Sequence, residues 1–210
     1  MDTEKLLELC NRLVADMFMA ERCLNCEKIL SEKILSEEKM IHSAFFELAR
    51  QSFLYTGTII LCKAFEEEST HNRPFSIMQI LQWTRNTVKL SQKERAQLEK
   101  LENEYQNNVA IEKLKTQRDK FYAHNDKIDP DDLVNTCCLL RNEKLSLIHF
   151  ALKVLSFVTC LCKQEPVFCY RDRDESTKRL QLILDDLEQY HNVILPWIWQ
   201  KRIEEQTNND

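Results

Sequence analysis

The chain has 210 residues, a formal net charge of −5 and a single glycine, Gly57. Globular proteins contain roughly 7% glycine. The deficit therefore excludes proteins that need several glycines, namely P-loop and dinucleotide-binding proteins and turn-rich β-sandwiches. Apolar residues make up 43% of the chain and charged residues 30%, which predicts a folded chain with a hydrophobic core.

Apolar residues at helical spacing predict helices along nearly the whole chain. The first helix is expected over residues 3–35, where one apolar face contains Leu6, Cys10, Leu13 and Met17. A second helix is expected from Ser36 to about Glu68, with Gly57 inside it. A glycine inside a helix costs about 1 kcal/mol relative to alanine, so we expect Gly57 to allow a neighbouring helix to approach closely.

Two later helix starts have the spacing of a capping box, in which two side chains three residues apart each bond the other's backbone N–H. Ser76 and Gln79 predict the start of a third helix, and Ser91 and Glu94 predict the start of a fourth. A fifth helix is expected to carry Ile111, Leu114, Phe121 and Tyr122.

The two remaining helices differ in their apolar surface. The helix expected over residues 142–163 is apolar on most sides, with a narrow polar stripe of His149, Lys153, Ser156 and Lys163. We expect it to be a buried, central helix and not a membrane span. The last helix carries Leu180, Ile183, Leu184 and Leu187. After it, Trp197 and Trp199 are expected to dock the C-terminal end on the bundle, although such rings can also stack on bases.

Together these elements predict an all-α fold, an antiparallel helical bundle with long helices. The length fits one domain, so we expect residues 1–210 to form a single domain. Its core is expected at about residues 36–165, with a helix over residues 3–35 and a helix over residues 176–205 packed on it.

Nine cysteines at irregular spacing, with no export signal in the acidic start of the chain, predict reduced thiols in a cytoplasmic protein. Cys23-x2-Cys26 has the spacing of half a zinc site, which Cys160-x-Cys162 or Cys137-Cys138 could complete. No second pair with that spacing follows, so we favour buried thiols and expect no metal and no cofactor. Glu66–Glu68 near His71 could also bind a metal, but a solvated helix end is the favoured interpretation.

The segment from Lys115 to Lys127 contains the residues best suited to phosphodiester chemistry, Arg118 and His124. A guanidinium matches two phosphate oxygens, and an imidazole exchanges a proton near neutral pH. An Arg–His spacing of this kind is expected about once by chance in a chain of this composition. Spacing alone therefore favours an ordinary surface arginine and a helix-end histidine.

The wider pattern Arg118-Asp119-Lys120-x-x-Ala123-His124-x-Asp126 resembles the signature of the HEPN superfamily of small α-helical proteins. It is most similar to the AbiU-type abortive-infection branch. The resemblance extends upstream to Phe45–Leu48, Leu61–Phe65 and Phe75–Ile77, and covers about residues 36–165.

The resemblance implies a HEPN-like homodimer that acts as a metal-independent endoribonuclease, with attack by the RNA 2′-hydroxyl. Arg118 would stabilise the phosphorane, His124 would serve as general acid or base, and Asp119 would orient one of them. We expect the neighbouring residues Lys120, Tyr122, Asn125 and Asp126 to contribute to binding. The products would be a 2′,3′-cyclic phosphate and a 5′-hydroxyl.

Charge and family set the expected partners. Residues 113–127 contain five basic and two acidic residues, a local charge of +3, but a chain of net charge −5 is not a general nucleic-acid binder. We therefore expect activity on selected RNA, in abortive infection or as the toxin of a toxin–antitoxin pair with an antitoxin protein as partner, and no membrane. The alternative is a non-catalytic HEPN-like module that binds a protein or a nucleotide.

Overall fold

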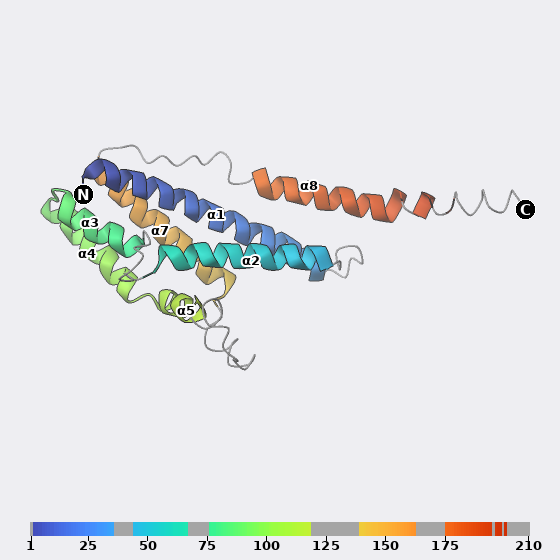
Figure 1. Cartoon of the computed structure of the whole chain (residues 1–210), viewed down its shortest axis with the longest axis horizontal. Coiled ribbons are helices and arrows are strands. Elements are labelled where there is room, and N and C mark those ends of the chain that lie inside the picture. Colours follow the sequence, from blue (N-terminus) through green and yellow to red (C-terminus); the bar gives the residue numbers. More distant parts are fainter. Residues whose placement is uncertain are drawn as a thin grey trace, which may run out of the picture. The chain divides into compact units, whose positions relative to one another are not determined.

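The structure is a computed structural model that describes residues 2–35, 44–66, 76–118, 139–162, 175–194, 196–198 and 200. These residues are 91% helical and contain no strand, which confirms the all-α prediction. Figure 1 shows the elements in chain order: α1 (Thr3–Leu35), α2 (Ala44–Ala64), α3 (Ile77–Thr87), α4 (Gln92–Gln106), α5 (Val109–Gln117), α7 (Arg141–Leu161), α8 (Glu175–Gln189) and the π-helix η3 (Tyr190–Ile194).

The chain divides into two compact units, so a single domain over residues 1–210 stays a prediction. The first unit comprises Met1–Leu24 and Leu54–Cys169, and the second comprises Asn25–Phe53 and Tyr170–Asp210. The core of the first unit takes buried apolar side chains from α1, α2, α3, α4, α5 and α7. This unit contains Arg118 and the helices that position it.

Helix α7 occupies the central place predicted for residues 142–163. It packs against α3 and α5, and its buried side chains include Leu147, Ile148, Phe150 and Val154. In the described part of the chain, α7 is the one helix long and apolar enough to cross a membrane, and half of its most apolar stretch is buried inside the protein. His149 and Lys153 on the expected polar stripe are exposed.

The second unit has a small core of its own, in which Leu30 of α1 and Leu184 of α8 are buried. Lys33 and Glu188 join the same two helices through an ion pair of 2.9 Å. Other apolar side chains of α8 and of the residues after it are exposed: Leu182, Ile183, Leu187, Tyr190, Val193 and Trp197. Trp197 is 56% exposed, and the expectation that its ring docks on the bundle stays a prediction.

The two predicted helix starts are confirmed, one of them as a complete capping box. Ser91 accepts a hydrogen bond from the Glu94 N–H, and the Glu94 carboxylate accepts one of 2.7 Å from the Ser91 N–H. The bonds from the Ser91 side chain and backbone lower the pKa of Glu94. At α3, Ser76 accepts from the Gln79 N–H, but the buried Gln79 amide group has no partner among the described residues.

Gly57 lies where α1 and α2 approach each other closely, as the sequence predicted. A Cβ atom at this position would lie 3.2 Å from the Cys23 Cβ, 3.3 Å from the Ala20 carbonyl oxygen and 3.4 Å from the Leu24 Cγ. The Ala20 carbonyl oxygen is a main-chain atom and the Cys23 Cβ is bonded directly to the main chain, so neither can rotate away. The glycine therefore fixes the spacing between the two helices.

We expect Gly57→Leu to lower the free energy of unfolding by about 1–3 kcal/mol, because added side-chain volume would push α1 and α2 apart. The exposed neighbour Thr56 supplies the control, since Thr56→Leu adds a similar side chain on the open side of α2. Urea denaturation followed by circular dichroism measures both. Equal stability of the two variants would contradict a tight helix contact at Gly57.

Candidate functional site

Arg118 follows the last residue of α5 and continues its helical geometry, with φ −57° and ψ −53°. The start of the helix is capped by Asn108, whose side chain accepts a 3.0 Å hydrogen bond from the Ala110 N–H. Ile111 and Leu114 then bury the inner face of α5 in the core of the first unit. The position of the Arg118 backbone is therefore set by a capped helix anchored on the core.

The Arg118 guanidinium pairs with Glu66, which stands just after the end of α2. The Arg118 Nη1 and the Glu66 Oε1 are 3.1 Å apart, and the two side chains are 28% and 29% exposed. Opposite charges that are partly removed from water attract more strongly than fully exposed ones. The ion pair joins the ends of two helices that lie 52 residues apart in the sequence.

The backbone beneath Glu66 is held firmly by Phe65, which is fully buried. The Phe65 ring stacks against Tyr105 and Phe150, with centroids 5.9 and 6.4 Å away. The Tyr105 hydroxyl also donates a 3.0 Å hydrogen bond to the Phe65 carbonyl. These contacts fix the chain one residue before the carboxylate that meets Arg118.

Two further contacts hold α5 in place. The Cys62 thiol of α2 donates to the Leu114 carbonyl across 4.0 Å. Lys113 pairs with Glu143 of α7 at 2.8 Å, and its hydrogen bond, with a second from the Leu140 N–H, lowers the pKa of Glu143. The helix that presents Arg118 is thus tied to both α2 and α7.

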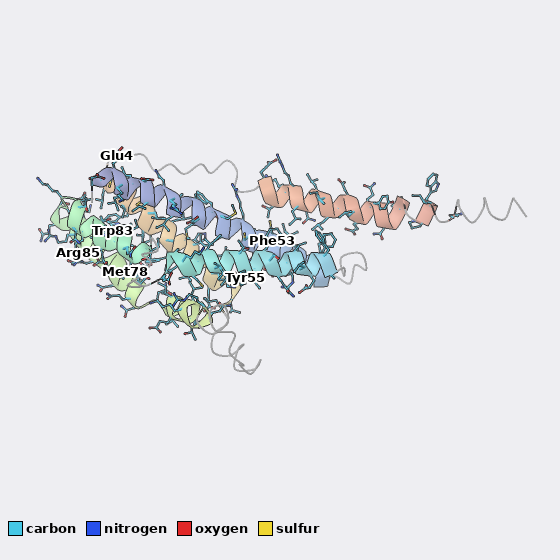
Figure 2. The ribbon with its side chains drawn as sticks, viewed as in Figure 1. Glu4, Phe53, Tyr55, Met78, Trp83 and Arg85 are labelled. Carbon is cyan, nitrogen blue, oxygen red and sulfur yellow. The ribbon has the colours of Figure 1, made fainter. Side chains whose placement is uncertain are left out.

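A cavity of about 210 Å³ lies beside the same helix, lined by Met78, Tyr105, Gln106, Asn108, Ile111, Glu112 and Lys115. Figure 2 shows Met78 on α3, which forms one edge of this cavity. Its lining carries charges of both signs, and its volume falls below the roughly 300–1,000 Å³ typical of ligand pockets. We therefore do not assign a separate ligand to it.

Of the predicted site residues, the structure describes Arg118 alone. The others, Asp119, Lys120, Tyr122, His124, Asn125 and Asp126, lie outside the described residues, so the pairing of Arg118 with His124 stays a prediction. The fifth helix was expected to include Phe121 and Tyr122, which also lie outside the described part. Glu66 lies at the expected end of the second helix and is partly exposed, but its pairing with Arg118 was not predicted.

The cysteines that suggested half a zinc site, Cys23 and Cys26, are buried thiols, as are Cys10 and Cys62. No group of three or more metal-binding side chains occurs within the described ranges. Burial, with a smaller contribution from Cys162, raises the pKa of Cys10 to about 12. This thiol therefore stays protonated and apolar in character, as expected of a core residue.

A comparison with protein families shows to which family the chain belongs. The family model HEPN_AbiU2, described as AbiU2, matches residues 3–161. The match covers more than half of the chain, so this protein belongs to the AbiU2 family of HEPN proteins. No curated protein and no solved structure matches the chain.

The match differs in extent from the resemblance seen in the sequence, which covers about residues 36–165. It begins at Thr3, the first residue of α1, and ends at Leu161, the last residue of α7. The N-terminal helix therefore belongs to the family domain, whereas α8 lies beyond the match. Both Arg118 and His124 fall inside it. Family membership supports ribonuclease activity or abortive infection as a role at the level of the family.

Proposed function

We propose that this protein is a metal-independent endoribonuclease of the HEPN type that acts in abortive infection or as the toxin of a toxin–antitoxin pair. The observation that carries the proposal is the placement of Arg118. This arginine of the family signature stands at the end of a core-anchored helix, with its guanidinium partly exposed. A fixed guanidinium at the surface is suited to binding a phosphate with two hydrogen bonds.

In the proposed reaction, the RNA 2′-oxygen attacks the adjacent phosphorus and the bond from phosphorus to the 5′-oxygen breaks. Arg118 stabilises the negative charge that develops on the phosphorane. One His124 accepts the 2′-hydroxyl proton, and a second donates a proton to the leaving 5′-oxygen. A homodimer supplies both histidines, and Asp119 orients one of the reacting side chains.

The remaining parts of the proposal concern binding and location. Lys120, Tyr122, Asn125 and Asp126 contact the RNA around the scissile phosphate. The net charge of −5 supports action on selected RNA in place of any exposed strand. An antitoxin protein would hold the toxin inactive in the cytoplasm until the trigger arrives.

The test is cleavage of cellular RNA by the full chain in excess EDTA, with analysis of the product ends. We expect cleavage that leaves 2′,3′-cyclic phosphates and 5′-hydroxyls, and its loss in His124→Ala. The exposed His149 supplies a matched control, since His149→Ala should cleave like the wild type. RNA that is bound but never cut would support the non-catalytic module, and equal cleavage by His124→Ala would exclude this mechanism.

A further inference from the structure

We infer that Glu66 competes with RNA phosphate for the Arg118 guanidinium and thereby restricts binding to RNA that makes additional contacts with the protein. The inference rests on the proposed function for its ligand, single-stranded RNA. It adds a specificity-determining residue that comes from α2, far from the signature segment in the sequence. Three observations support it: the geometry of the ion pair, its exposure and the charge of the chain.

The geometry allows exchange of one anion for another. Glu66 meets Arg118 through Nη1 and Oε1 at 3.1 Å. A phosphate offers two oxygens to the guanidinium fork and can therefore form a bidentate contact. Because both side chains are more than one-quarter exposed, a phosphate can approach from solvent.

The charge of Glu66 opposes that approach. A carboxylate beside the guanidinium neutralises it and repels a phosphate, and partial burial strengthens this repulsion relative to bulk water. The net charge of −5 supplies no long-range attraction that would offset the repulsion. An RNA must therefore make other favourable contacts with the protein before its phosphate can replace Glu66 at the Arg118 guanidinium.

The experiment measures binding without cleavage, using the full chain and a fluorescein-labelled single-stranded RNA that is 2′-O-methylated throughout. Glu66→Gln keeps the size of the side chain and removes its charge. We expect it to bind this RNA about tenfold more tightly than the wild type in fluorescence anisotropy. Glu112→Gln removes the same charge from an exposed position on α5, and we expect less than about a twofold change there.

A double-mutant cycle shows whether the gain passes through Arg118. We expect Glu66→Gln to have no effect on affinity when Arg118 is alanine. A gain no larger than that of Glu112→Gln, a gain that persists without Arg118, or no measurable binding by either wild type or Glu66→Gln would overturn the inference. Thermal melts verify that each variant is folded. If Glu66→Gln does not fold, Glu66→Asp replaces it, because aspartate keeps the charge but lies one methylene further from Arg118. A gain in RNA affinity by Glu66→Asp that depends on Arg118 would support the inference, and no gain would overturn it.

The outcomes separate this inference from the proposed function. Tighter binding by Glu66→Gln together with no RNA cleavage by the wild type would support the competition and refute the ribonuclease. Cleavage that requires His124 together with unchanged affinity in Glu66→Gln would do the reverse.

Discussion

Replacing Arg118 with alanine should lower the rate of RNA cleavage by about 10²–10³-fold, the loss typical when one preorganised donor to a transition-state oxyanion is removed. The guanidinium is placed by α5, a helix anchored on the core, so little rearrangement of the backbone is needed when charge develops on the phosphorane. Single-turnover cleavage of a defined RNA measures this rate directly, independently of product release.

Two further variants show whether the loss of cleavage comes from the guanidinium itself and not from a change in charge or stability. Arg118→Lys keeps the charge but loses the planar fork, so its rate should lie between those of the wild type and the alanine variant. Arg85, labelled on α3 in Figure 2, also pairs with a carboxylate, that of Glu102. Arg85→Ala removes an ion-paired arginine elsewhere on the first unit and should leave the rate unchanged. Similar losses in Arg85→Ala and Arg118→Ala would contradict a specific role for Arg118.

The second large effect concerns stability. Phe65→Ala should lower the free energy of unfolding by about 3–5 kcal/mol, the usual cost of removing a buried aromatic ring. The ring is fully buried and stacks with Tyr105 and Phe150, so the cavity left behind would be surrounded by large side chains that cannot easily fill it. Urea denaturation of the full chain gives this value.

Phe45 offers the matched control, because the same substitution there removes a ring that is 70% exposed. Phe45→Ala should change the free energy of unfolding by no more than about 0.5 kcal/mol. If the two alanine variants are equally stable, the aromatic cluster around Phe65 does not support the end of α2, and the firm placement of Glu66 would have to come from elsewhere.

The parts of the fold that the sequence predicted well depend on local signals. The bounds of α1 agree with the expected residues 3–35, because helical periodicity is continuous there. The Ser91 capping box depends on groups three residues apart, which the sequence displays directly. The close helix contact at Gly57 could be predicted for a different reason. A glycine inside a helix lowers the stability of that helix and therefore indicates a packing requirement.

The features that escaped prediction depend on contacts between distant segments. No local pattern connects Glu66 with Arg118, because their pairing follows from how the core places α2 beside α5.

The buried thiol of Cys10 gives this protein an internal reporter of its own stability. Alkylating reagents attack the thiolate, and a pKa raised to about 12 keeps that species scarce while the core is closed. Cys160 on α7 is exposed and is accessible to such a reagent in the native state. The delay between labelling of Cys160 and of Cys10 therefore measures how often the core of the first unit opens, without any dye or engineered tag.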